Sequence, residues 1–149
     1  MPNNYMQLAL CEAELAAARG EVPVGAVIVD PASGDVLARA GNRTLADNDP
    51  TAHAEMLVIR AAASRIKSQR LTGLDLYVTL EPCAMCAAAI SFARIRRLYY
   101  GADDEKSGGV LHGPRFFTQP ACHHAPEVYG GIDSIRAQGL LRAFFQTRR

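Results

Sequence analysis

The sequence lacks the features of a membrane-spanning or exported protein. No stretch approaches the roughly 18 consecutive apolar residues of a membrane span, although 49% of the 149 residues are hydrophobic. The first residues, MPNNYMQLALCEAE, contain neither a basic region nor a long apolar segment, so no signal peptide is expected. These absences predict a cytoplasmic protein that has no membrane partner.

The sequence also lacks an excess of charge of either sign. Its formal net charge is +1, so the chain has no overall field that would attract a polyanion. If nucleic acid is a partner, the basic residues that bind it must be clustered locally. With 49% hydrophobic and 21% charged residues, the chain is expected to fold around a packed core as a single domain, residues 1–149.

Cysteine is scarce, with only four residues in the chain: Cys11, Cys83, Cys86 and Cys122. In a reducing compartment these residues are expected to be thiols or metal ligands and not disulfides. Cys11 is expected to be a buried position of the first helix.

The hydrophobic pattern predicts helices and strands in alternation. The expected helices cover residues 4–19, 51–67, 81–94 and 132–149, and the expected strands cover 22–30, 36–40, 74–80, 96–102 and 127–129. The segment 103–126 has no clear period and is expected to form short turns. This alternation favours an α/β fold with a mixed, mainly parallel sheet covered by helices.

The second helix has clear start signals in Asp49, Pro50 and Thr51. Its apolar residues follow helical spacing, which predicts the face that it buries. The residues of this predicted face are Met56, Ile59, Ala63 and Ile66.

Two short patterns contain residues suited to metal chemistry. The stretch TAHAEM, residues 51–56, places His53 two positions before Glu55. Such a histidine is also common as a capping or core residue, and a glutamate in the first turn is favoured by the helix dipole. The stretch PCAMC contains Cys83 and Cys86, which are otherwise interpreted as a redox pair or a chance spacing.

Taken together, the two patterns predict a catalytic zinc site. His53, Cys83 and Cys86 are three ligands, and a tetrahedral zinc ion would keep a fourth position open for water. Zinc lowers the pKa of a coordinated water to about 7, which supplies a nucleophile for hydrolysis at neutral pH. Glu55 would lie beside the metal and move a proton. The order H-x-E and then P-C-x-x-C is the signature of the zinc deaminases.

A rival cluster consists of Cys122, His123 and His124. Adjacent histidines on one loop rarely converge on one ion, and no acidic residue follows them at a comparable spacing. We therefore expect this cluster to belong to a structural or surface loop.

A family resemblance rests on five segments of the sequence. They read EVPVGAVIV, GNR, DPTAHAE, LYVTLEPCAMCAAAI and RRLYYGADDEKSGG. Together they resemble the bacterial tRNA-specific adenosine deaminases over roughly residues 5–110, whereas segment 110–129 does not match the better-known members well. The resemblance implies the cytidine-deaminase-like fold, which is a three-layer α/β/α sandwich around a mixed five-stranded sheet.

The resemblance also implies an activity and a set of residues. The chain would be a homodimer with one zinc ion (Zn2+) per chain, and it would deaminate the wobble adenosine of a tRNA anticodon stem-loop to inosine. Glu55 would be the proton carrier. Asn42 would hydrogen-bond the target base, the backbone N–H of Ala54 would face that base, and Asp104 would touch the nucleotide backbone. The zinc ligands would be His53, Cys83 and Cys86.

Three functions remain open from the sequence. The first is the tRNA adenosine deaminase. The second is a free-base or nucleoside deaminase that acts on guanine or cytosine with the same zinc chemistry. The third is a structural zinc module that binds RNA without catalysis, and Glu55 argues against it because a structural site does not need that carboxylate.

Two basic clusters are candidates for RNA contact. Residues 136–149 contain four arginines and no acidic residue, with Phe144 and Phe145 among them. Arg148 or Arg149 would contact RNA, or these arginines would be solvated while the apolar side chains pack the helix onto the domain. The stretch RIRR, residues 94–97, would serve either RNA or a dimer interface.

Overall fold

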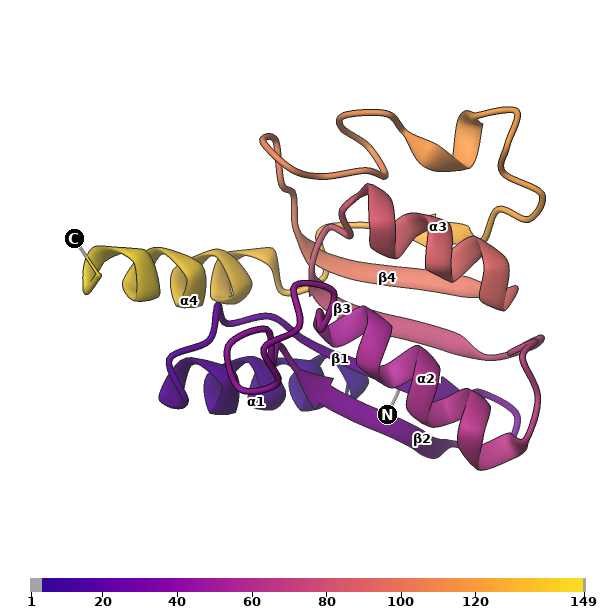
Figure 1. The fold of residues 1–149 in the computed structure, drawn as a ribbon, viewed down its shortest axis with the longest axis horizontal. Coiled ribbons are helices and arrows are strands. Elements are labelled where there is room, and N and C mark those ends of the chain that lie inside the picture. The colour runs from indigo at the N-terminus through magenta and orange to yellow at the C-terminus, as the bar shows by residue number, and fades with distance from the viewer. Residues whose placement is uncertain (1–3, 149) are drawn as a thin grey trace.

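The fold is built on one mixed sheet with the strand order β2-β1-β3-β4-β5, seen in a computed structural model that describes residues 4–148 (Figure 1). The strands are β1 (Gly25–Asp30), β2 (Asp35–Gly41), β3 (Asp75–Leu80), β4 (Arg97–Ala102) and β5 (Glu127–Tyr129). The helices are α1 (Asn4–Ala18), α2 (Ala54–Ile66), α3 (Ala84–Ala93), the short 3-10 helix η1 (Phe116–Thr118) and α4 (Ser134–Gln146). Within the described part of the chain, no helix combines the length and the apolar character needed to cross a membrane.

The strand directions agree with the expected mixed, mainly parallel sheet, because β2, β3, β4 and β5 all run in the same direction. β1 pairs antiparallel with both β2 and β3, whereas β3, β4 and β5 run parallel to one another. β1 is the strand that runs in the opposite direction, and it lies between β2 and β3. The crossover from β2 through α2 to β3 joins two strands of the same direction, and β1 occupies the place between them.

Helices cover both faces of the sheet, α1 and α4 on one side and α2 and α3 on the other (Figure 1). Alternate residues of β1 serve the two sides because successive side chains of a strand point to opposite faces. Ala26 and Ile28 belong to the core under α2 and α3, and Val27 and Val29 to the core under α1. The expected three-layer α/β/α sandwich is therefore confirmed.

The helix α2 begins later than predicted. Its first residue is Ala54, and His53 is its N-cap. The carboxylate of Asp49 accepts hydrogen bonds from the backbone N–H of Thr51 at 2.8 Å and from its hydroxyl at 2.7 Å. The start signals at 49–51 therefore build a turn that precedes the helix.

The buried face of α2 also differs from the predicted one. Its buried residues are Ala54, Glu55, Val58 and Ala62. The predicted residues flank this face: Met56, Ile59 and Ala63 are half-buried and Ile66 is exposed. Small side chains face the sheet because they allow the helix to approach it closely.

The expectation for Cys11 is wrong too, since this residue of α1 is exposed.

Candidate metal centre and its pocket

Three ligating side chains converge at the starts of α2 and α3. The Nδ1 atom of His53 lies 3.7 Å from the Sγ atom of Cys83 and 3.5 Å from that of Cys86. All three ligating atoms lie within 4.8 Å of one another. A tetrahedral zinc ion with Zn–N of about 2.0–2.1 Å and Zn–S of about 2.3 Å holds nitrogen and sulfur about 3.6 Å apart. The observed separations therefore fit zinc.

The fold places these side chains at helix starts. His53 is the N-cap of α2 and Cys83 is the N-cap of α3, and both have an extended backbone conformation. Neither side chain caps its own helix. Cys86 lies one turn further along α3 and is buried. Both ligand-bearing ends are thus directed at one point, where the helix dipoles favour thiolate.

The charge state of the cysteines follows from their contacts. Hydrogen bonds from Cys86 and His53 lower the pKa of the Cys83 thiol to about 4, although its partial burial opposes this. The hydrogen bond with Cys83 raises the pKa of the Cys86 thiol, because the two sulfurs share one proton. The hydrogen bond with Cys83 also raises the pKa of His53. Cys83 is therefore held as the thiolate, which is the form that binds metal.

Glu55 lies in the first turn of α2, where it is only 4% exposed and lines a cavity beside the three ligating atoms. Burial raises the pKa of its carboxyl group to about 7. A group with a pKa near neutrality is able both to accept and to donate a proton. A dication nearby would favour the carboxylate and lower this pKa again.

The cavity has a volume of about 230 Å³ and opens between two loops. One loop contributes Asn42 and Thr44, and we call residues 42–46 the Asn42 wall. The other contributes Asp104 and Ser107, and we call residues 103–112 the Asp104 wall. Pockets for drug-sized ligands range from about 300 to 1,000 Å³. This smaller pocket is therefore suited to a single planar ring system.

The predicted substrate residues Asn42 and Ala54 contact each other. The Oδ1 atom of Asn42 accepts a hydrogen bond of 2.8 Å from the backbone N–H of Ala54. The N–H that was expected to face a base is thus taken by Asn42 in this structure. With its oxygen engaged, Asn42 has its amide nitrogen Nδ2 left as a donor toward the pocket.

Asp104 lies where the small pocket meets a wider cavity. Its carboxylate accepts hydrogen bonds from the backbone N–H groups of Lys106 at 3.2 Å and Ser107 at 3.0 Å, which shapes the turn. The wider cavity, of about 720 Å³, shares Asp104 and Ser107 with the small pocket and is bounded on its other side by Leu141 and Phe145 of α4. The two cavities therefore adjoin.

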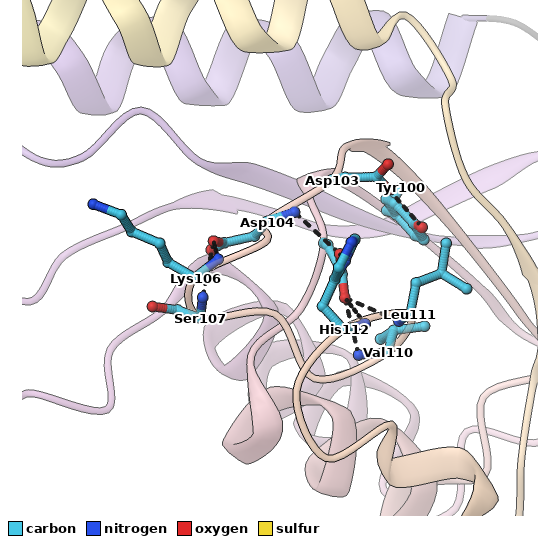
Figure 2. A network of polar contacts seen from close by, with 9 residues as sticks. Tyr100, Asp103, Asp104, Lys106, Ser107, Val110, Leu111 and His112 are labelled. Atoms are coloured by element: carbon cyan, nitrogen blue, oxygen red, sulfur yellow. Dashed lines mark hydrogen bonds and ion pairs between the residues drawn. The ribbon is translucent and has the colours of Figure 1, made fainter.

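Two buried carboxylates, which the sequence interpretation missed, hold the walls. Glu81 accepts hydrogen bonds from the N–H groups of Asp104, Val110, Leu111 and His112 and from the Nδ1 atom of His112, at 2.7 to 3.1 Å. Figure 2 shows these residues of the Asp104 wall gathered around one carboxylate. Burial alone would raise the pKa of Glu81, but these donors, led by the N–H of Asp104, hold it below its usual value.

Glu21 accepts hydrogen bonds from the Asn42 wall in the way that Glu81 does from the Asp104 wall. It accepts hydrogen bonds from the hydroxyl of Thr44 at 3.3 Å and from the N–H groups of Leu45 at 3.2 Å and Ala46 at 2.9 Å. The only signal for these two residues in the sequence is an acidic residue beside an apolar run, in GEVPV and in VTLEPC.

The rival cluster does not converge on one point. The thiol of Cys122 lies 3.5 Å from the hydroxyl of Ser91 and donates to the carbonyl of His124. The ring of His124 donates from Nε2 to the carbonyl of Ile95 at 2.7 Å, and His123 is exposed. These contacts fasten the loop to the end of α3, as a structural interpretation expects.

The basic clusters are largely engaged by neighbouring side chains. Arg96 makes two hydrogen bonds to Asp75, at 2.9 and 2.7 Å, and Arg97 lies 3.4 Å from Glu127. Arg96 and Arg97, two of the arginines in segment 94–97, are therefore paired with carboxylates. Arg148 lies over the ring of Phe144 at 3.6 Å from its centroid, and Arg149 lies outside the described residues.

Comparison with known proteins supplies a family for this arrangement. Residues 2–102 match the family model of the cytidine and deoxycytidylate deaminase zinc-binding region. The chain is 60% identical over 146 residues to the tRNA-specific adenosine deaminase of Agrobacterium fabrum, which covers 98% of this chain and 95% of that relative. The likeness thus extends beyond the segments that carried the resemblance in the sequence.

Solved structures share the architecture. One comes from biochemical and structural studies of A-to-I editing by tRNA deaminases at the wobble position of transfer RNA; it has a TM-score of 0.90 and 60% identity, and the match covers 93% of this chain and 99% of that one. The guanine deaminase of Nitrosomonas europaea has a TM-score of 0.84 with 21% identity, over 97% of this chain and 84% of that one. At that identity the second likeness shows the fold alone.

Proposed function

The chain belongs to the tRNA-specific adenosine deaminase family, and we propose that it converts the wobble adenosine of a tRNA anticodon loop to inosine by hydrolytic deamination. The observation that carries this proposal is the 60% identity to a relative of that name over 98% of the chain. The pocket supports it, because a ligand set, a buried carboxylate and a base-sized cavity lie together. All parts of the proposed reaction lie around that one cavity.

We propose that His53, Cys83 and Cys86 hold one zinc ion per chain. Their nitrogen–sulfur separations of 3.5 and 3.7 Å support this ligand set. When bound, zinc supplies a Lewis acid and a lowered pKa for water, which is the chemistry that hydrolysis needs. The thiolate character of Cys83 favours binding, because a metal must otherwise displace that proton.

Asn42 and the apolar lining would orient the base. Asn42 is tied through its oxygen to Ala54, so its Nδ2 group is able to donate to a ring nitrogen of adenine. Val22, Val24 and Leu80 line the same pocket and would pack against the base and exclude bulk water. The base would thus be held in one orientation with its amine carbon toward the three ligands.

Glu55 would carry the protons. Its carboxylate accepts a proton from the attacking water and delivers it to N1 of adenine, and a further transfer lets the C6 amine leave as ammonia. The net reaction consumes one water and releases one ammonia. Its buried position in the pocket lining, beside the ligand set, supports this role.

A polynucleotide substrate fits the two adjoining cavities better than a free base does. When one base is flipped into the small pocket, the adjacent nucleotides would lie in the wider cavity. Flipping a base out of an anticodon loop costs little free energy, because the bases of the loop are already unpaired. The carboxylate of Asp104 would accept a hydrogen bond from a ribose hydroxyl, since its negative charge disfavours a phosphate.

The test compares substrates with the zinc-loaded protein. We expect inosine and ammonia from an anticodon stem-loop with adenosine at the wobble position, and no product when that adenosine is replaced by another nucleotide. Free adenosine, guanine and cytosine should not be converted. Conversion of guanine or cytosine without conversion of the stem-loop would overturn the proposal in favour of a free-base deaminase, and zinc binding without any turnover would favour a structural module.

We further propose that the chain acts in the cytoplasm, where its proposed tRNA substrate is found, as a single-domain homodimer. Large apolar side chains on the α2 and α3 side support the dimer, because Phe92 is 73% exposed and Ile66 is 39% exposed. Light scattering should give twice the chain mass for the wild type and a lower mass for Phe92→Glu. A monomeric wild type would contradict the dimer.

A further inference from the structure

We propose that Glu21 and Glu81 are positioning residues that fix the two walls of the pocket. This inference rests on the proposed function, because it assigns the walls to the recognition of the nucleotide. Both side chains are almost completely buried, at 1% and 2% exposure, and both use their oxygens on loop donors. Each carboxylate therefore acts on the substrate through a loop.

Glu81 engages the Asp104 wall with both oxygens. Oε1 accepts from the N–H of Asp104 at 3.0 Å and from Nδ1 of His112 at 2.7 Å. Oε2 accepts from the N–H groups of Val110, Leu111 and His112 at 2.9 to 3.1 Å. A Cβ atom at position 108 would collide with this carboxylate, so Gly108 allows the close approach.

The Asp104 wall is also tied to the segment that contains a predicted zinc ligand. The N–H of Gly109 donates to the carbonyl of Pro82 at 2.8 Å, and Gly108 forms an isolated bridge with Cys83. Because Glu81 immediately precedes this segment, it fixes Asp104 and the loop around it relative to the metal centre.

Glu21 engages the Asn42 wall in the same manner. Its Oε1 atom accepts from the Thr44 hydroxyl and the Leu45 N–H, and its Oε2 atom accepts from the Ala46 N–H at 2.9 Å. The N–H of Asn42 donates to the carbonyl of Val24 at 3.1 Å, which ties the start of this wall to the segment that follows Glu21. These hydrogen bonds therefore fix the positions of Asn42 and Thr44 relative to the Asp104 wall.

Carboxylates suit this task because the groups to be held are donors. A glutamine has the same shape, but one of its two terminal atoms is an NH₂ donor that cannot accept a hydrogen bond. In Glu81→Gln, either the N–H of Asp104 or the three N–H groups on Oε2 lose their acceptor. Glutamine variants therefore remove part of the anchoring and change the packing little.

Hydrogen exchange of the zinc-loaded protein tests the anchoring directly. Glu81→Gln should accelerate exchange about tenfold at Asp104 or at 110–112, whichever set loses its acceptor, and leave 45–46 unchanged. Glu21→Gln should accelerate exchange at 45 or 46 and leave the Asp104 wall unchanged. Glu14→Gln, a control on the exposed side of α1, should change neither wall. If exchange accelerates at both walls together, or at neither, the proposal is overturned.

A milder variant covers the case in which Glu81→Gln does not fold. His112→Ala removes only the imidazole donor and leaves the four N–H groups on Glu81. It should accelerate exchange at the Asp104 wall alone, by less than the glutamine variant. No acceleration at that wall would count against the proposal.

Steady-state kinetics separate positioning from general stability. Both glutamine variants should raise KM for the stem-loop about tenfold, with kcat and zinc content near wild type, because the walls contact the substrate equally before and during the reaction. A merely structural role would lower the active fraction, and so kcat, at unchanged KM. If the wild type does not act on the stem-loop, the proposed function fails, whereas hydrogen exchange still decides whether the carboxylates hold the walls.

Discussion

The two ends of the sheet use their polar side chains in opposite ways. At the end away from the pocket, which we call the ladder end, Tyr77, Tyr99 and Tyr129 lie in register on β3, β4 and β5. Their ring centroids are 4.4 and 5.1 Å apart. Asp75 and Glu127 lie two residues earlier on their strands and pair with Arg96 and Arg97. At the pocket end, the buried carboxylates hold backbone groups.

The difference separates stability from chemistry. At the ladder end, side chains pair and stack with one another and attach β5, an edge strand of three residues. At the pocket end, Glu21 and Glu81 take up the donors of two loops, and Glu55 and Asn42 remain directed at the cavity. Substitutions at the two ends should therefore affect different measurements.

The largest expected effect is at the pocket end. Glu55→Gln should reduce inosine formation by about 10²- to 10⁴-fold, which is the usual contribution of a proton-transferring side chain. Zinc content should stay at one ion per chain, because this residue is assigned no part in binding the metal. The matched control is Glu127→Gln at the ladder end, which should leave turnover unchanged. Loss of zinc from Glu55→Gln would show that its role is wrongly assigned.

The next effect is a loss of stability without a loss of chemistry. Asp75→Ala should lower the free energy of unfolding by about 1–2 kcal/mol, because Arg96 loses both of its hydrogen bonds but is partly solvated. Urea unfolding measures this change, and kcat per zinc-loaded chain should not change. Glu14→Ala, which breaks an exposed pair with Arg136, should cost less than about 0.5 kcal/mol. Equal losses in the two variants would contradict the comparison.

The pocket end should contribute a pH dependence of stability through Glu21. Burial would raise the pKa of Glu21, but hydrogen bonds led by the Ala46 and Leu45 N–H groups hold it below 4.5. The unfolded chain therefore binds this proton more tightly, so the stabilisation is present above pH 4.5 and is lost as the pH falls through the lowered pKa.

Urea unfolding from pH 3 to 7 checks this dependence. The difference in unfolding free energy between the wild type and Glu21→Gln should be constant above about pH 6 and about 1 kcal/mol smaller at pH 3. Acid also releases the metal, but it does so in both proteins, so that contribution cancels. A difference independent of pH would show that Glu21 does not hold its wall as an anion.

The smallest expected effect is at the edge strand. Tyr129→Leu keeps an apolar side chain but removes the stacking on Tyr99 and the hydrogen bond to Glu127. It should lower the free energy of unfolding by about 0.5 kcal/mol and leave KM for the stem-loop unchanged. A rise in KM would mean that the two ends are coupled.

Local sequence patterns predicted those parts of the site whose residues lie within a single helical turn of one another. A C-x-x-C pair at a helix start puts both sulfurs on one side, and H-x-E puts His53 at the cap and Glu55 in the first turn of α2. The three layers of the fold also followed from the family resemblance. The start of α2 was misplaced because Asp49 and Thr51 form a turn of their own.

Contacts between distant segments were not predictable in the same way. The backbone donors that Glu81 collects lie 23 to 31 residues away and have no signature in the side chains. The stacking of Tyr99 on its neighbours requires the strand register, and the antiparallel position of β1 requires the whole sheet order. Sequence spacing contains none of this information.

Because Glu81 accepts its hydrogen bonds mainly from main-chain N–H groups, the sequence of the Asp104 wall is able to vary during evolution. Almost any residue except proline can supply the N–H at positions 104, 110 and 111, so mutations there leave the fastening intact. Gly108 and Gly109 are exceptions, because neither position has room for a side chain. Lineages of this enzyme are thus free to diversify what the loop presents to a ligand while inheriting the same frame.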